Sequence, residues 1–351
     1  MAHRLFIGLG HHSLRHRVWR RQYLCKGPQP GETAMNTPVT AHSVAEPSSR
    51  SKLIASVVVV TYAVITILPL LWIFLTGFKT PPDSIAYPPR ILFEPSVEGY
   101  VNLFTTRSRQ TPEFLASLPP PQTWYERLVR SRNMVIGGPS KVVPRFLNSM
   151  IIGFGSTFLA VCFGTIAAYA FSRFRVPLAD DLLFFILSTR MMPPIAVAIP
   201  IYLMFRHLGL SDTKLGMILL YTAVNVALAV WLLKGFMDEI PREYEEAAMV
   251  DGYTRLQAFF KVVLPQATTG IAATAIFCLI FAWNEYAFAV LLTSGEAQTM
   301  PPFIPFIIGE GGQDWPAVAA ATTIFFIPIL CFTILLRRHL LRGITFGAVR
   351  K

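Results

Sequence analysis

Charged residues are scarce in this 351-residue chain: Asp, Glu, Lys and Arg make up 15% of it, whereas hydrophobic residues make up 53%. A soluble globular domain carries roughly 25% charged residues, so this chain has too little charge to cover a surface that faces water. The mean hydropathy is +0.49, and several apolar runs approach the roughly 20 residues that a helix needs to cross a membrane. Composition therefore excludes ordinary cytosolic, fibrous and disordered classes and predicts an integral membrane protein.

Patterns typical of enzymes and metal sites are also missing. The four cysteines are scattered at positions 25, 162, 278 and 331, and no pair has the spacing of a metal or redox site. The chain contains no Ser-His-Asp cluster and no Gly-x-x-x-x-Gly-Lys-Ser/Thr sequence, which would bind the phosphates of ATP. We therefore predict no catalytic residue, no metal site and no cofactor in this chain, and we expect the cysteines to act as small hydrophobic residues in helices.

Six apolar runs predict six membrane-spanning helices. They cover about residues 54–76, 148–171, 182–205, 215–237, 269–292 and 317–336. The third run contains Met191-Met192-Pro193-Pro194 and later Pro200, so we expect this helix to be interrupted. Ala160, Gly164 and Ala168 share one face of the second run, and alanines crowd the start of the sixth, which predicts closely packed helices there.

The distribution of Lys and Arg predicts the orientation, because cytoplasmic loops carry an excess of these residues. The loop after the second run contains Arg173 and Arg175, and the loop after the fourth contains four basic residues. The loop 293–316 has three acidic residues and no basic one, so it is expected outside. Both termini are then cytoplasmic. The short loop after the third run carries Arg206 and Lys214 and fits this orientation less well.

Most of the positive charge lies in a tail. Residues 1–52 hold eight Lys or Arg and two Glu, a net charge of +6 out of +11 for the chain. We predict three parts: a basic, disordered cytoplasmic tail at 1–52, a transmembrane domain at 53–342 and a cytoplasmic tail at 343–351. Because we attribute these Lys and Arg residues to the cytoplasmic flanks of membrane spans, nucleic acid is not an expected partner. Translation starting at Met35, with residues 1–34 absent from the mature protein, is an alternative.

Two loops of the transmembrane domain stand out. An external insert at about 78–146 separates the first two spans, and its section 107–144 has no functional interpretation from sequence. The cytoplasmic loop 238–266 predicts two short helices. Pro241 suits a first helical turn, Gly252 suits a left-handed helix end, and Thr254 suits the cap of a second helix that runs to Pro265.

The loop 238–266 carries a specific spacing: Glu246-Ala247-Ala248, then Gly252, then Val262-Val263-Leu264-Pro265. This spacing resembles the Glu-Ala-Ala motif of binding-protein-dependent ABC importer permeases. The resemblance covers residues 53–351 and includes Asn148-Ser149, Ala168-Tyr169-Ala170-Phe171-Ser172-Arg173, Leu208-Gly209-Leu210-Ser211-Asp212-Thr213, Trp283-Asn284-Glu285-Tyr286 and Gly343-Ile344-Thr345-Phe346-Gly347-Ala348-Val349. It implies an all-α, six-helix inner-membrane permease of the type I importer class, similar to the subunits of maltose importers.

The resemblance also implies a mechanism. The loop would dock as a coupling helix on a separate ATP-binding subunit, which binds ATP and Mg. Glu246 would contact that subunit, Ala247 and Ala248 would allow close approach, and Gly252 would form the bend. The expected coupling residues are Glu246, Ala247, Ala248, Asp251, Gly252, Val262, Leu264 and Pro265.

Substrate-path candidates come from polar residues within the spans. A charge at a helix centre costs about 2.5–3.5 kcal/mol on insertion scales, so Arg190 and Glu285 should face a cavity or a partner. The neighbours of Glu285, which are Trp283, Asn284 and Tyr286, are the other candidates. The alternative for this group is a role in helix packing and subunit contact.

The expected function is a permease subunit of an ATP-driven importer for a sugar or polyol. The expected partners are a second permease subunit that forms a hetero-pair with this chain, two copies of an ATP-binding subunit and an external solute-binding protein. The alternatives are the same importer for a solute such as glycerol phosphate, or a secondary transporter that works alone. The sequence identifies neither the solute nor whether the two permeases are distinct or identical.

Overall fold

The structure, a computed structural model, describes residues 48–309 and 312–346, with side chains described as far as residue 336. The predictions for residues 1–47, including the start at Met35, and for residues 347–351 fall outside the described residues. The chain divides into two units, residues 1–60 and 61–351. The described part of the first unit consists of residue 48 and the start of helix α1, residues 49–60, and each of these residues is exposed. Residues 49–52 are therefore helical, whereas the sequence placed them in a disordered tail.

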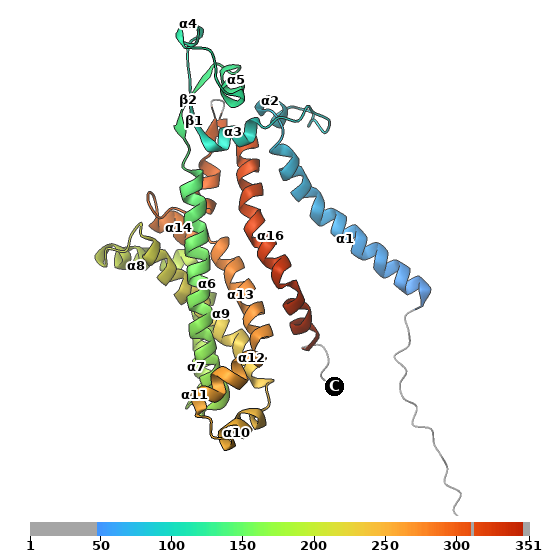
Figure 1. Cartoon of the computed structure of the whole chain (residues 1–351), viewed down its shortest axis with the longest axis vertical. Helices are drawn as coiled ribbons and strands as arrows, with labels where there is room; N and C mark the ends of the chain where they lie inside the picture. The colour runs from blue at the N-terminus through green and yellow to red at the C-terminus, as the bar shows by residue number, and fades with distance from the viewer. Residues whose placement is uncertain (1–47, 310–311, 347–351) are drawn as a thin grey trace, which may run out of the picture. The chain divides into compact units, whose positions relative to one another are not determined.

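Four helices in the described part of the chain are long and apolar enough to cross a membrane. They correspond to the first, second, fourth and sixth predicted spans (Figure 1). These helices are α1 (Ser49–Thr76), α6 (Val142–Arg173), α9 (Lys214–Asp238) and the first 22 residues of α16 (Trp315–Phe346).

The third predicted span is a bent pair of helices. Helices α7 (Ala179–Met191) and α8 (Pro194–His207) meet at an angle of 90°. Proline lacks the N–H that continues a helix and also disfavours the helical conformation in the residue before it. The expected interruption is therefore confirmed at Met192 and Pro193, whereas Pro200 lies inside α8 without ending it.

The fifth predicted span is not one continuous helix. Helix α13 (Thr268–Trp283) stops, and α14 (Ala287–Leu292) begins after three residues. Glu285 lies in this break, and its carboxylate accepts hydrogen bonds from the N–H groups of Phe288 (2.8 Å) and Ala289 (3.1 Å). The first N–H groups of a helix have no partner within the helix. The carboxylate therefore favours a new helix start at this point.

Small residues bring α6 and α9 together, as the sequence predicted. Ala160 and Ala168 are 0% exposed, and Gly164 between them is buried. A Cβ atom added at Gly164 would lie 2.5 Å from the Cβ of Ala229 and 3.1 Å from its backbone carbon. The glycine is required because Ala229 of α9 occupies the space that a side chain would need.

Replacing Gly164 by Ala should therefore destabilise the protein by about 1–3 kcal/mol, the usual cost of overpacking. Gly235 in α9 is the matched control, because a Cβ added there meets no atom within 4 Å. Gly235→Ala should be neutral or slightly stabilising, since alanine is the better helix former. Thermal unfolding of the purified variants measures the difference, and equal melting temperatures would refute the close contact.

The insert between α1 and α6 contains both helices and strands, whereas the sequence predicted an all-α fold. An antiparallel pair of strands, β1 (Thr105–Arg109) and β2 (Met134–Pro139), is at its centre. Arg132 pairs with Glu98 at 3.1 Å, and Arg107 pairs with Asp314, which precedes α16, also at 3.1 Å. The insert also contains α2 (Pro81–Ser84), α3 (Glu98–Phe104), α4 (Pro112–Ser117) and α5 (Trp124–Arg130).

The segment between α14 and α16 contains α15 (Met300–Phe303), the 3-10 turn η2 (Ile304–Phe306) and two short strands, β3 (Ile308–Gly309) and β4 (Gly312–Gln313). Gly312 has a φ of 111°, which favours glycine. Residues 310–311 lie outside the described part of the chain.

The start of this segment is held from two sides. Asn148 of α6 donates hydrogen bonds to the carbonyl oxygens of Glu296 (2.6 Å) and Gln298 (2.9 Å). Burial raises the pKa of Asp212, but hydrogen bonds from backbone N–H groups of the segment outweigh it, so this pKa lies below its usual value. Two positions of the sequence resemblance, Asn148 and Asp212, therefore fix this loop. The N–H groups that contact Asp212 are those of Ser294, Glu296 and Ala297, at 2.9–3.2 Å.

Candidate functional site

Helix α10 (Arg242–Val250) lies at one end of the helical bundle, beyond the ends of α6 and α9 (Figure 1). Pro241 is its N-cap residue, one position before the first helical turn in which the sequence predicted it. Glu243 and Glu245 lie in its first turn, where the helix dipole favours negative charge. The local sequence therefore determines where this short helix begins.

The end of α10 is fixed by Gly252, which has a φ of 91°. The N–H of Gly252 donates to the carbonyl oxygen of Met249 (3.1 Å), and the N–H of Tyr253 donates to that of Ala248 (3.0 Å). This pair of hydrogen bonds around a left-handed glycine is the Schellman motif, a common helix end. The predicted bend at Gly252 is present.

A second helical segment returns the chain to the bundle. Thr254 and Gln257 form a reciprocal capping box at the start of α11 (Arg255–Ala258). A π-helical segment, η1 (Phe259–Val263), and α12 (Leu264–Gln266) follow. The segment of α11, η1 and α12 meets α13 at an angle of 72°. Together with α10 it forms the predicted pair of short helical segments.

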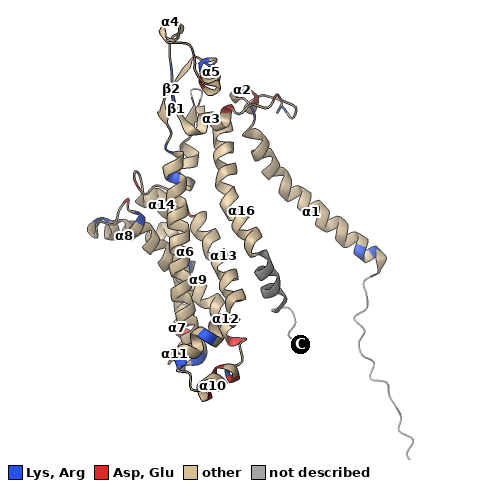
Figure 2. Ribbon diagram, viewed as in Figure 1, with Lys and Arg blue, Asp and Glu red and all other residues tan. Residues whose placement is uncertain are grey.

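The predicted coupling residues divide between the two faces of this hairpin. Glu246 and Ala247 are exposed, whereas Ala248 is 6% exposed and faces the protein. Asp251, Gly252 and Pro265 are exposed, and Val262 and Leu264 are half-buried. Glu246 and Ala247 therefore leave one carboxylate and one methyl group exposed at the surface, and charged residues gather around α10 and α11 (Figure 2).

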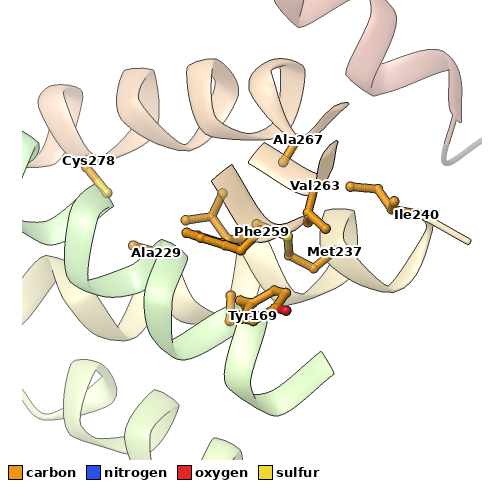
Figure 3. Packing of buried hydrophobic residues seen from close by; sticks show 10 residues of the cluster. Tyr169, Ala229, Met237, Ile240, Phe259, Val263, Ala267 and Cys278 are labelled. Atoms are coloured by element: carbon orange, nitrogen blue, oxygen red, sulfur yellow. The ribbon is translucent and has the colours of Figure 1, made fainter. Parts of the chain in front are cut away.

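A cluster of buried hydrophobic residues supports the hairpin from inside. Phe259 and Val263 of η1 pack against Met237 of α9 and Tyr169 of α6 (Figure 3). The rings of Tyr169 and Phe259 have their centroids 4.6 Å apart. The hairpin is therefore packed on α6 and α9 and does not extend freely from the chain.

Sequence reasoning missed Glu245 as a functional candidate. Its side chain is 5% exposed and pairs with Arg173 at 3.0 Å. The hydroxyl of Tyr169 donates to its other carboxylate oxygen. A signal was available, since Tyr169 and Arg173 belong to the stretch 168–173 that carries part of the family resemblance.

The substrate-path candidates separate into packing residues and cavity residues. Trp283 is 2% exposed, its ring stacks on Phe325 at 4.8 Å, and its Nε1 donates to the carbonyl oxygen of Phe325 at 3.1 Å. Asn284 is exposed and donates to the carbonyl oxygen of Ile280 at 2.8 Å. Tyr286 is exposed. Trp283 is thus a packing residue between α13 and α16.

Arg190 and Glu285, in contrast, line the same cavity. This cavity has a volume of about 120 Å³ and adjoins one of about 590 Å³ at the bend between α7 and α8. Arg190 donates to the carbonyl oxygen of Val224 (3.1 Å) and to Oδ1 of Asn225 (3.0 Å). Glu285 accepts a hydrogen bond from the hydroxyl of Tyr221 at 2.6 Å. The two charges predicted to need a cavity or a partner have both.

The aromatic residues of these cavities add a second kind of contact. The guanidinium of Arg190 lies 4.1 Å from the ring centre of Phe281, and Phe281 and Phe288 line both cavities. Among the described residues, no group of three or more His, Cys, Asp or Glu is placed to hold a metal ion. The site therefore offers hydrogen bonding, charge and aromatic contact.

Comparison with known proteins gives the family. Residues 160–346, more than half of the chain, match the family described as binding-protein-dependent transport system inner membrane component. A probable ABC transporter permease protein, y4oR, of Sinorhizobium fredii is 31% identical over 288 residues, which cover 82% of this chain and 92% of that protein. The trehalose transport system permease protein SugB of Mycobacterium tuberculosis is 38% identical over 207 residues, which cover 58% of this chain and 76% of that protein.

The fold is also found among solved structures. A crystal structure of a bacterial ABC transporter involved in the import of the acidic polysaccharide alginate contains a chain with a TM-score of 0.60 and 19% identity. The match covers 82% of this chain and 95% of that one. The chain therefore belongs to the binding-protein-dependent inner-membrane permeases, the transport components of ABC importers.

Proposed function

We propose that α10 of this permease is the surface on which an ATP-binding subunit docks, so that ATP drives the import. The observation that carries this proposal is the division of α10 into a packed face and an exposed face. Glu246 and Ala247 are exposed at the end of the bundle, and Ala248 is packed against the protein. An exposed carboxylate beside a small side chain suits a partner that approaches closely and carries a positive charge.

The proposed assembly follows from this docking surface. The end of the bundle with α10 faces the cytoplasm, as do both termini. Two copies of the ATP-binding subunit bind ATP and Mg, and a second permease subunit completes the path. An external solute-binding protein delivers the solute at the end with the insert. When the ATP-binding subunits close on ATP, they displace α10 and, with it, the helices that it contacts.

The proposed cargo is a sugar or polyol. The relative from Mycobacterium tuberculosis is named as a trehalose permease. In this chain, Glu285, Tyr221 and Asn225 bring hydrogen-bonding groups to a cavity that Phe281 and Phe288 also line. Aromatic rings suit the apolar faces of a sugar, and polar groups suit its hydroxyls.

Arg190 favours a second candidate, an anionic solute such as glycerol phosphate. Its guanidinium lines both cavities, and its hydrogen bonds to Val224 and Asn225 go to neutral groups. A phosphate would satisfy the remaining donors of this side chain.

Uptake into liposomes tests the function. The chain would be co-purified with its partner subunits, reconstituted and supplied with the solute-binding protein, ATP and radiolabelled trehalose or glycerol phosphate. We expect uptake that requires ATP and the solute-binding protein. Uptake by the chain alone, driven by an ion gradient, would refute the proposal and favour a secondary transporter.

A further inference from the structure

Three polar side chains lie buried where α6 meets α10. Arg173 and Glu245 form an ion pair at 3.0 Å, and both side chains are 5% exposed. The hydroxyl of Tyr169, one helical turn before Arg173, donates to the second carboxylate oxygen of Glu245. Both oxygens of the carboxylate therefore have a donor, and both donors come from the last turns of α6.

Additional hydrogen bonds fix the arginine. Nη2 of Arg173 donates to the carbonyl oxygen of Ile240 (2.9 Å), just before α10, and Nη1 donates to the hydroxyl of Ser172 (2.9 Å). Arg242, at the start of α10, donates to the carbonyl oxygen of Ser172 (2.6 Å). Polar contacts thus connect α6 with both the entry to α10 and its first turn.

Hydrophobic side chains pack around this cluster. The ring of Tyr169 lies 4.6 Å from that of Phe259 and 6.0 Å from that of Phe174. Ile240 and Met237 belong to the same buried group (Figure 3). Separating a buried ion pair costs much free energy, because each charge is then left without a partner. The two side chains are therefore held in one relative position.

The chain itself connects α10 only to α9 and, through α11, η1 and α12, to α13. The polar cluster adds a third connection, to α6, which is far away in the sequence. A displacement of α10 that left α6 behind would have to separate a buried ion pair. A buried ion pair is weak evidence for stability, whereas it can fix the relative position of two elements.

We propose that Tyr169, Arg173 and Glu245 form a coupling latch, which makes α6 move together with α10 when an ATP-binding subunit displaces that helix. The three are positioning residues, since they contact neither solute nor ATP. The inference rests on the proposed function and adds to it: Glu246 receives the partner, and Glu245 passes the displacement to the second span. It also gives the stretch 168–173 a role beyond helix packing.

A double-mutant cycle in the reconstituted importer tests the latch. The variants are Arg173→Gln, Glu245→Gln and the double variant, and the control is Asp181→Asn, an exposed acid in the first turn of α7 and outside the loop 238–266. The rates of solute import and of ATP hydrolysis are both measured for the same amount of assembled complex. The quantity compared is their ratio, the solute imported per ATP hydrolysed. A purely structural defect lowers the amount of complex and both activities together, and leaves this ratio unchanged.

We expect each single variant to lower the ratio about tenfold, because each leaves a buried charge without its partner. The double variant should be no worse than either single variant, since residues that act as a pair are not additive. The control should match the wild type. Single variants equal to the control, or losses that multiply in the double variant, would overturn the latch.

A milder variant decides the question if the charge variants do not assemble. Tyr169→Phe keeps the buried ring and removes only the hydroxyl, so it should assemble and lower the ratio about two- to threefold. A wild-type ratio in this variant would then overturn the latch. A wild-type complex without ATP-dependent uptake would overturn the proposed function and the latch with it, whereas normal wild-type uptake with unaffected variants would overturn the latch alone.

Discussion

Replacing Glu246 by Lys is expected to abolish transport while the chain still reaches the membrane and folds. The Glu246 side chain is exposed on α10, so a lysine creates no clash and leaves no buried charge unpaired. At a docking surface, however, the reversal would place two positive charges against each other, which costs several kcal/mol. We therefore expect the ATP-binding subunit to bind at least about a hundredfold more weakly.

Co-purification of the ATP-binding subunit and ATP-dependent uptake measure this effect. Asp181→Lys is the matched control, because Asp181 is also an exposed acid near the start of a helix but lies in α7, outside the loop 238–266. This control should bind the ATP-binding subunit and transport at wild-type levels. Equal behaviour of the two variants would show that Glu246 has no special role in docking.

Replacing Gly252 by Val is expected to have the second large effect. The glycine has a φ of 91°, and an L-residue in the left-handed region costs roughly 1–2 kcal/mol, with β-branched residues the least tolerated. A Cβ at this position meets no atom within 4 Å, so the cost arises from the backbone alone. The bend after α10 should shift, and transport should fall about tenfold or more.

A graded series separates backbone strain from other causes. Asparagine tolerates positive φ better than other non-glycine residues, so Gly252→Asn should retain most of the uptake, with Gly252→Ala between the two. The abundance of each variant in the membrane should match the wild type. Equal uptake in all three variants would contradict a requirement for the left-handed conformation.

The hairpin of α10 and α11 could be predicted from the sequence because local rules determine it. Pro241, Gly252 and Thr254 are each suited to one position at a helix end, and they occur at the right spacing. The bend at Pro193 and Pro194 follows from equally local chemistry. Strong local preferences of this kind leave little for tertiary contacts to change.

The different roles of Glu245 and Glu246 could not be predicted from the local sequence. Both are acidic residues near the start of α10, and the difference between them depends on which one faces Arg173, 72 residues earlier in the chain. The break between α13 and α14 also depends on tertiary contacts. The run 269–292 is apolar enough for one span, yet Glu285 caps a new helix there and accepts a hydrogen bond from Tyr221 on α9.

The cavity residues were predicted only in part for the same reason. The cost of a charge in a membrane identified Arg190 and Glu285, and both line the cavity between α7, α9 and α13. Trp283, Asn284 and Tyr286 are adjacent to Glu285 in sequence but do not line it. Residues that are neighbours in the sequence here have side chains in different surroundings, and only Glu285 lines the cavity.

Site-specific photo-crosslinking from α10 tests the central claim most directly. A photoreactive amino acid would replace Ala247, which is exposed on α10, and, as a control, Leu92, which is 93% exposed in the insert at the other end of the bundle. Both would be irradiated in the assembled importer. The account predicts an adduct with the ATP-binding subunit from position 247 and none from position 92. An assembled, transport-competent complex that gives no such adduct from position 247 would contradict it.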